Sequence, residues 1–124
     1  MAFFIQKIME FINKEISEYS LSHTEKEPEI LAELNRETWA NVMMPRMLSG
    51  HLQGRILSMF SKMINPKNII EIGTYTGYSA LCMAEGIQND GTLHTIDINE
   101  ETTSIAKKYF KKSKYSKNIK QHLG

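Results

Sequence analysis

The sequence is short of the features that would place it outside ordinary globular proteins. Its 124 residues include one cysteine and three prolines, and the formal net charge is +1. The lone Cys82 excludes a disulfide within the chain and favours a reducing, cytoplasmic location. Near-neutral charge gives no general attraction to nucleic acid or to an anionic membrane. No apolar run approaches the roughly 18 residues of a membrane-spanning helix. These absences predict one globular unit at most.

The amino-terminal half has helical spacing of its apolar residues. We expect an amphipathic helix over Phe3–Tyr19, packed on its own domain or on a second subunit. Thr24 and Glu27 suggest a capping box for a second helix that runs to about Val42 and places five residues toward the core: Ile30, Leu31, Leu34, Thr38 and Trp39.

Pro45 ends this second helix, and a third is expected over His51–Ile64 with Ser49 as its N-cap. The apolar spacing predicts that one face of the third helix is buried, namely Leu52, Ile56, Leu57, Phe60 and Ile64.

The stretch Asn68–Asp97 has the pattern of a strand, a glycine turn, a helix and a second strand. Asn68–Ile72 is a short β-branched run that predicts a buried strand, and Tyr78–Ile87 has helical composition. Thr92–Ile96 is the second strand and ends at Asp97. This βαβ unit has the layout of a nucleoside-binding site.

The residues of the turn and strand ends favour one kind of ligand. Gly73 and Gly77 let the backbone pass close to a bound group, and Asp97 can accept hydrogen bonds from ribose hydroxyls. Thr74 stands where a dinucleotide fingerprint has its middle glycine, and Glu71 would repel a pyrophosphate. A ligand with a ribose, an ammonium group and no phosphate fits better, and S-adenosylmethionine is such a ligand.

Three motifs resemble one enzyme family. The run Glu71–Ser79, EIGTYTGYS, is similar to the first motif of class I methyltransferases, in the form of the cation-dependent catechol and caffeoyl-CoA O-methyltransferases. Thr95–Asn99, TIDIN, resembles their second motif, and Met47–Gly54, MLSGHLQG, resembles the segment before their first strand. The resemblance covers roughly residues 20–124.

This resemblance implies S-adenosylmethionine as cofactor, a small catechol-like or phenolic acceptor, a homodimer, and a Mg²⁺-like divalent cation in the full-length enzyme. It implies no nucleic-acid or membrane partner. The residues expected to bind the cofactor are Met47, Ser49, Glu71, Gly73, Thr74, Gly77, Ser79, Asp97 and Ile98. No catalytic residue and no metal ligand is assigned within the 124 residues.

The expected fold class is α/β, a Rossmann-like methyltransferase fold truncated to its amino-terminal helices and the first half of its parallel sheet. Residues 1–65 would form the helices, and residues 66–124 would form strands one to three, in the order 3-2-1. We therefore expect the first strand to have an open edge and the chain alone to be inactive. The alternative is a non-catalytic remnant that binds a nucleoside weakly or self-associates; a nicotinamide dehydrogenase is disfavoured by the glycine spacing.

The remaining polar residues carry little functional signal. The four histidines show no metal-ligand spacing, and His94 is expected to be a structural residue with its hydrogen bonds satisfied. Cys82 is expected to be a small buried hydrophobe. Asn99 should cap a helix whose lysine-rich carboxyl end is solvated, because a nucleic-acid patch would also need arginines and aromatic side chains. A third strand is expected over Asn118–Leu123.

Overall fold

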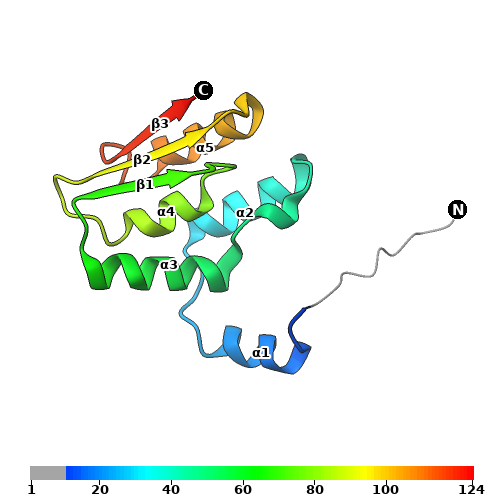
Figure 1. The fold of residues 1–124 in the computed structure, drawn as a ribbon. Helices are drawn as coiled ribbons and strands as arrows, with labels where there is room; N and C mark the ends of the chain where they lie inside the picture. Colours follow the sequence, from blue (N-terminus) through cyan, green and yellow to red (C-terminus); the bar gives the residue numbers. More distant parts are fainter. Residues whose placement is uncertain (1–10) are drawn as a thin grey trace, which may run out of the picture.

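The computed structural model describes residues 11–124 and shows a three-stranded parallel sheet with helices packed on one face (Figure 1). The strands are β1 (Asn68–Ile72), β2 (Thr92–Asp97) and β3 (Ile119–Leu123), in the order β1-β2-β3. Asn68 pairs with Thr92, and Leu93 pairs with Ile119. The helices are α1 (Lys14–Ser22), α2 (Glu29–Asn41), α3 (Gly50–Ile64), α4 (Tyr78–Ala84) and α5 (Glu100–Lys112), with a 3-10 turn, η1, at Pro45–Met47.

The core lies between the sheet and helices α2, α4 and α5. Leu93 of β2 is fully buried, as are Leu34 of α2, Ala80 of α4 and Ala106 of α5. Asn99 caps α5 as predicted, because its Oδ1 accepts a hydrogen bond of 3.1 Å from the Thr102 amide. In the described part of the chain, no helix combines the length and the apolar character needed to cross a bilayer.

The bounds of β1 and the strand order confirm the sequence prediction, and β2 and β3 differ from their predicted bounds by one residue each, but the predicted burial of β1 is wrong. Ile70 and Ile72 are exposed, at 73% and 87%, although the apolar run predicted a buried strand. Side chains alternate across a sheet, so Glu71 lies on the face that the helices cover, and Ile70 and Ile72 lie on the other. No element formed by residues 11–124 covers that second face, and β1 has one free edge as expected.

Helix α1 begins later than the sequence predicted. Residues 3–10 of the expected helix Phe3–Tyr19 lie outside the described part of the chain. The helix begins at Lys14 because the Asn13 side chain caps it, accepting a hydrogen bond of 2.8 Å from the Glu15 amide. It ends at Ser22 rather than Tyr19, and none of its residues is buried. Packing of this helix on its own domain is therefore wrong for the described residues, whereas packing on a second subunit stays a prediction.

The start of α2 is not a capping box. Pro28 is the N-cap and makes no side-chain capping bond, while Thr24 donates to the carbonyl of Ser20 at 2.6 Å. The Glu27 carboxylate instead accepts a hydrogen bond of 2.5 Å from the Tyr78 hydroxyl, which ties the connector to α4. Leu31, Leu34 and Thr38 are buried as predicted, but Trp39 is 53% exposed.

Helix α3 buries a different face from the predicted one, although Leu57 of the predicted face packs partly against the core. Its buried face carries Gly54, Arg55, Ser58 and Ser61, whereas Ile56, Phe60 and Ile64 are exposed. The small residues explain this orientation. A Cβ on Gly54 would lie 2.7 Å from the Tyr78 ring, so the helix approaches α4 more closely than a larger residue would allow.

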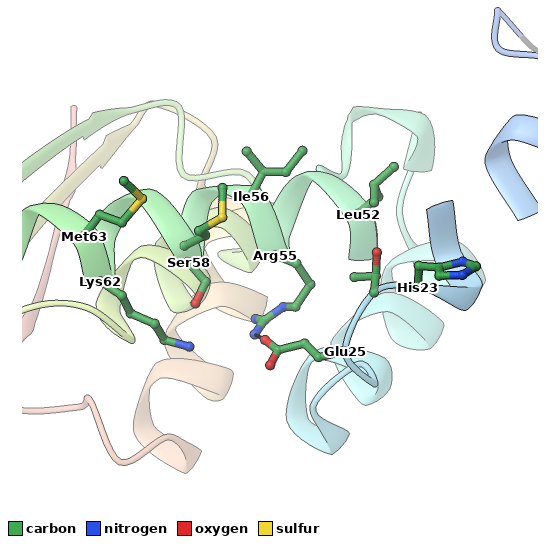
Figure 2. Close-up of a pocket in the computed structure, with 10 residues that line it drawn as sticks. His23, Glu25, Leu52, Arg55, Ile56, Ser58, Lys62 and Met63 are labelled. Atoms are coloured by element: carbon green, nitrogen blue, oxygen red, sulfur yellow. Dashed lines mark hydrogen bonds and ion pairs between the residues drawn. The ribbon is translucent and has the colours of Figure 1, made fainter. Parts of the chain in front are cut away.

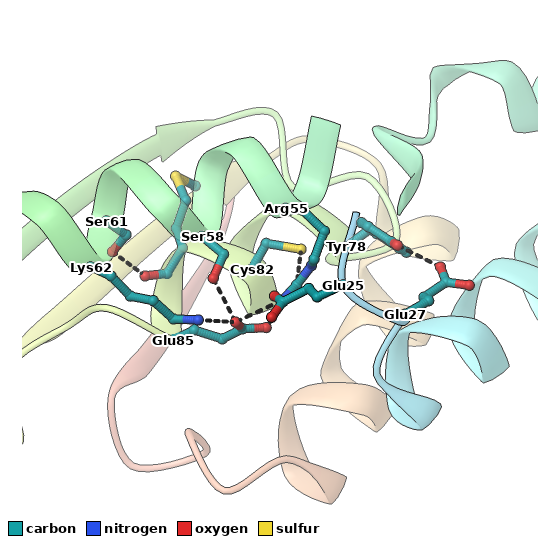
Figure 3. A network of polar contacts seen from close by, with 10 residues as sticks. Glu25, Glu27, Arg55, Ser58, Ser61, Lys62, Tyr78, Cys82 and Glu85 are labelled. Atoms are coloured by element: carbon teal, nitrogen blue, oxygen red, sulfur yellow. Dashed lines mark hydrogen bonds and ion pairs between the residues drawn. The ribbon is translucent and has the colours of Figure 1, made fainter. Parts of the chain in front are cut away.

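A buried ion cluster fills this α3–α4 interface (Figure 3). Arg55 Nη2 lies 2.6 Å from Glu85 Oε1, and Ser58 Oγ donates to Glu85 Oε2 at 2.5 Å. Lys62 Nζ lies 3.3 Å from the same carboxylate. Burial by itself would raise the pKa of Glu85, but hydrogen bonds from Arg55 and Ser58 outweigh it and lower the pKa. Each charged group of the cluster therefore has a partner of opposite sign within the chain.

Candidate functional site

The turn between β1 and α4 depends on two glycines with different surroundings. Gly73 and Gly77 both have a positive φ, 97° and 92°. A Cβ at Gly77 would come within 2.7 Å of the Phe110 ring, so this glycine permits close packing of the turn on α5. A Cβ at Gly73 would meet no atom within 4 Å, so Gly73 borders open space. The turn thus exposes its backbone to open space at Gly73 and packs against α5 at Gly77.

Asp97, at the end of β2, is held by backbone amides. Its Oδ2 accepts a hydrogen bond of 2.8 Å from the Tyr75 amide, and its Oδ1 accepts bonds of 2.7 and 3.0 Å from the amides of Ile98 and Asn99. Burial alone would raise the pKa of Asp97, but these amides lower it. The carboxylate is therefore ionised at neutral pH. Since a carboxylate has about four acceptor positions, about one stays free for a ligand hydroxyl.

Glu71, at the end of β1, is held by hydroxyl groups instead. Its Oε1 accepts a hydrogen bond from Ser79, and its Oε2 accepts one of 2.6 Å from Thr95. Thr95 Oγ1 also lies 2.7 Å from Thr74 Oγ1. Burial raises the pKa of Glu71, and the nearby charge of Asp97 raises it further, although the two hydroxyl bonds act in the opposite direction. Among residues 11–124, no basic side chain forms an ion pair with it.

A groove of about 480 Å³ opens above Gly73 and Asp97. One wall is the segment that contains Met43, Met44 and Met47, and the opposite wall is the start of α5 with Asn99, Glu101 and Thr102. The Tyr75 hydroxyl donates to the carbonyl oxygens of Met44 and Met43, at 3.1 and 3.3 Å, and so fastens the methionine segment to the glycine turn. This volume is in the range of small-molecule sites.

The predicted site residues fall into three groups. Met47, Gly73 and Asp97 line the groove, and Ile98 is exposed beside Asp97. Glu71, Thr74 and Ser79 form the hydrogen-bonded network beneath the turn, where the Thr74 side chain is buried. Gly77 packs on α5, and Ser49 stands at the start of α3 without a capping hydrogen bond. The cofactor contacts assigned to these residues stay predictions.

Sequence reasoning missed two residues that line the groove, Tyr75 and Asn99, and one residue of the network beneath it, Thr95. Tyr75 was overlooked as an ordinary turn residue, yet it has a left-handed φ of 51° and connects both Asp97 and the methionine segment. Asn99 was seen as a helix cap and not as a wall of the groove. Thr95 begins the second motif, which predicts no role for it, although its place two residues before Asp97 puts it on the same face of β2.

A second hollow, of about 580 Å³, lies along α3 on another part of the molecule (Figure 2). All four of Ile56, Met63, Arg55 and Lys62 line it; Ile56 and Met63 project from one side of α3, and Arg55 and Lys62 project from the other. Arg55 is already paired with Glu25 at 2.7 Å and with Glu85. Because its buried charge is neutralised from within the chain, this hollow offers less binding chemistry than the groove above Asp97.

The other polar groups do not assemble a metal centre in the described residues. Residues 11–124 contain no group of three or more His, Cys, Asp or Glu side chains that could hold a metal ion. His94 Nδ1 lies 2.9 Å from His122 Nε2 on the uncovered face of the sheet, which agrees with a structural histidine. Cys82 is buried as predicted, and burial raises the pKa of its thiol to about 12.

Comparison with known proteins identifies the family. The model of the O-methyltransferase family matches residues 19–124, so the chain belongs to this family. A caffeoyl-CoA O-methyltransferase of Nicotiana tabacum is 44% identical over 80 residues, which are 64% of this chain and 33% of that protein. The caffeoyl-CoA O-methyltransferase of Petroselinum crispum is 42% identical over 80 residues, again 64% of this chain and 33% of that protein.

Solved structures agree on the fold. The SAH-bound methyltransferase of Podospora anserina has a TM-score of 0.82 at 27% identity and covers 91% of this chain. The O-methyltransferase TomG of Streptomyces achromogenes, in complex with SAM, has a TM-score of 0.80 at 25% identity and covers 89%. The chain spans about a third of the curated relatives, 33%, and about half of these two structures, 50% and 49%. Its helices and sheet therefore match one half of a Rossmann-like methyltransferase fold.

Proposed function

We propose that this chain is the cofactor-binding part of an S-adenosylmethionine-dependent O-methyltransferase, a fragment of a longer enzyme. One observation carries the proposal. Asp97 is an amide-held, ionised carboxylate at the end of β2, and it faces the open space beside Gly73. Two solved relatives, crystallised with SAH and SAM, support the choice of ligand.

The residues of the groove suit the parts of this cofactor. Asp97 would accept a hydrogen bond from the ribose, and Gly73 would leave room for the ligand beside the turn. Glu71 is a partly buried carboxylate with no cationic partner among residues 11–124, so it would attract the ammonium group. Met47 would supply an apolar wall. The bound cofactor supplies an electrophilic methyl group, and these residues bind and orient it.

We propose a small catechol-like or phenolic acceptor whose hydroxyl receives the methyl group. The curated relatives with 44% and 42% identity are named for caffeoyl-CoA, which supports a phenolic substrate. A divalent cation would belong to the full-length enzyme. The described residues do not fit one, because they contain no ligand group for it, and we derive no metal-assisted step for this chain. A homodimer and a cytoplasmic location stay predictions from the sequence.

A non-catalytic nucleoside-binding remnant is the second candidate. The absence of a metal-ligand group in residues 11–124 favours it over an active enzyme made of this chain alone. We therefore expect the purified chain to transfer no labelled methyl group to a catechol. Measurable turnover by the chain would contradict both this second candidate and the fragment proposal.

Calorimetry with S-adenosylmethionine tests the proposed site directly. Asp97→Ala should weaken binding by about 1–3 kcal/mol, the scale of a lost charge-assisted hydrogen bond. Asp90→Ala is the matched control, because Asp90 is an exposed carboxylate that pairs with Lys67 at 3.3 Å, away from the groove. Equal affinities of the wild-type chain and the Asp97 variant would overturn the assignment.

A further inference from the structure

We infer that Thr95 is a positioning residue that aims the Glu71 carboxylate at the amino-acid end of the cofactor. The inference rests on the proposed function and deepens it, because it concerns how one end of the ligand is recognised. Its starting point is the hydrogen bond of 2.6 Å that Thr95 Oγ1 donates to Glu71 Oε2, between the ends of two neighbouring strands.

The direction of the hydrogen bonds follows from counting protons. A threonine hydroxyl has one proton to donate, and Thr95 gives it to Glu71 Oε2. The contact of 2.7 Å between Thr95 and Thr74 must then run the other way, with Thr74 as the donor. The result is a directed chain from Thr74 through Thr95 to Glu71, in which each bond polarises the next.

This arrangement also limits what Thr74 can do. Its hydroxyl proton is used inward, and its side chain is 1% exposed, so a ligand would meet the backbone of Thr74 and not its hydroxyl. The hydroxyl chain therefore ends in one group that can carry charge, the Glu71 carboxylate. Ser79 donates to the other oxygen of that carboxylate, so the two hydroxyls fix its orientation from both sides.

The buried position of Thr95 argues that its hydroxyl does more than fill space in the core. Thr95 is fully buried in β2, on the same face as the core residue Leu93. A valine would fill such a strand position without the cost of burying a hydroxyl. The hydroxyl is retained next to a carboxylate that has no cation among residues 11–124. Its hydrogen bond offsets part of the free-energy cost of desolvating the Glu71 carboxylate. A positively charged ligand group would offset the rest.

Two ligands separate recognition of the ammonium group from recognition of the nucleoside. S-adenosylhomocysteine carries the amino-acid end, and 5′-methylthioadenosine has the same nucleoside without it. Thr95→Val should weaken binding of S-adenosylhomocysteine by about tenfold or more, the effect of losing one hydrogen bond to a charged group. Binding of 5′-methylthioadenosine should stay unchanged, and Thr95→Ser should restore the affinity for S-adenosylhomocysteine.

Thr92→Val is the matched control, since Thr92 begins the same strand and lies outside the Glu71 network. Circular dichroism melting would establish that each variant is folded. If Thr95→Val weakened both ligands equally, or weakened neither, the positioning role would be overturned. If the wild-type chain bound neither ligand, the proposed function would fail, and this inference with it, which is a distinguishable result.

Discussion

Two partly buried glutamates in this molecule have opposite surroundings. Glu85, in the α3–α4 interface, is met by Arg55 at 2.6 Å and by Lys62 at 3.3 Å, and its pKa is lowered despite its burial. Glu71, beneath the glycine turn, is met by the hydroxyls of Ser79 and Thr95, and burial raises its pKa. In the first cluster, which also contains Glu25 on Arg55, every charged group has a partner of opposite sign, whereas among residues 11–124 Glu71 has none.

This difference separates a structural cluster from a binding cluster. A buried charge is costly unless it is paired, so a chain normally supplies both partners, as at Glu85. At Glu71 the described residues supply hydrogen-bond donors and no cation. An unpaired buried carboxylate beside a groove is a candidate functional group, because a ligand can provide the missing charge. The four predictions below test this contrast, from the largest expected effect to the smallest.

The largest effect is expected from removing the central cation of the Glu85 cluster. Arg55→Met should destabilise the chain by about 3–5 kcal/mol, because it leaves Glu85 buried without its main partner. Urea unfolding at neutral pH measures the change. The double variant Arg55→Met, Glu85→Gln should recover part of the loss. A single-variant cost below about 1 kcal/mol would show that the cluster is not effectively buried.

Replacing the serine that donates to each glutamate by alanine should lower the unfolding free energy by different amounts in the two clusters. Ser79→Ala leaves Glu71 with Thr95 as its remaining side-chain donor, so we expect a loss of about 2 kcal/mol, as for a hydrogen bond to a charged group. Ser58→Ala leaves Glu85 with Arg55 and Lys62, so about 1 kcal/mol is expected. Parallel urea titrations compare them. An equal or larger cost for Ser58→Ala would remove the distinction.

The two glutamates should also give opposite pH dependence of stability. The lowered pKa of Glu85 means that its contribution is present above its ordinary value of 4.5 and is lost as the pH falls through the folded-state pKa. The raised pKa of Glu71 means that its contribution is present below 4.5 and is lost as the pH rises through the folded-state pKa. Unfolding free energies should be measured at pH values below and above 4.5. The stability of the wild type relative to Glu85→Gln should rise with pH, and its stability relative to Glu71→Gln should fall with pH. Slopes of the same sign would contradict the assignment.

The smallest effect is expected at the exposed edge of the Glu85 cluster. The Lys62 side chain is 51% exposed, and Glu85 retains Arg55 when Lys62 is removed. Lys62→Met should therefore change the unfolding free energy by less than about 1 kcal/mol. Thermal unfolding at low and high salt is the measurement, and salt should have little influence on the variant. A loss as large as that of Arg55→Met would place Lys62 at the centre of the cluster instead.

Much of the sheet and of α5 could be predicted from sequence because local signals and tertiary structure agree there. Asn68–Ile72 was found with its observed bounds, and Asn99 marked the start of α5 through its side-chain cap. The order of the strands followed from the parallel βαβ pattern. In these regions the local sequence signals agree with the pairings that the folded chain adopts.

The orientation of α3 and the start of α1 could not be found in the same way. Apolar periodicity predicted that Ile56, Phe60 and Ile64 face the core, yet the close approach permitted by Gly54 and the charge of Glu85 turn the polar face inward. That choice depends on α4, which is distant in sequence. The exposure of Ile70 has a similar origin, since it depends on what covers the sheet and not on the strand itself.

The residues of the candidate site that belong to recognisable sequence motifs could be predicted. Gly73 and Asp97 could be named because a positive φ and a strand-end carboxylate have recognisable sequence contexts. Thr95 and Tyr75 could not, because their roles depend on partners in other elements: Glu71 for the first, and the carbonyls of Met43 and Met44 for the second. Such cross-element hydrogen bonds leave no periodic trace in the sequence.

The parallel register of the sheet has a consequence for how the chain folds. Asn68 meets Thr92, and Leu93 meets Ile119, so each strand pairing closes a loop that includes a whole helix. The three strands of the described residues form no hairpin that could be a local nucleus for the sheet, and loop-closure entropy must be overcome before any ladder bond between them forms. Helix formation and docking of α3 on α4 can precede these pairings. We therefore expect the sheet to form late and to set a slow folding rate, with apolar strand edges transiently open to other chains.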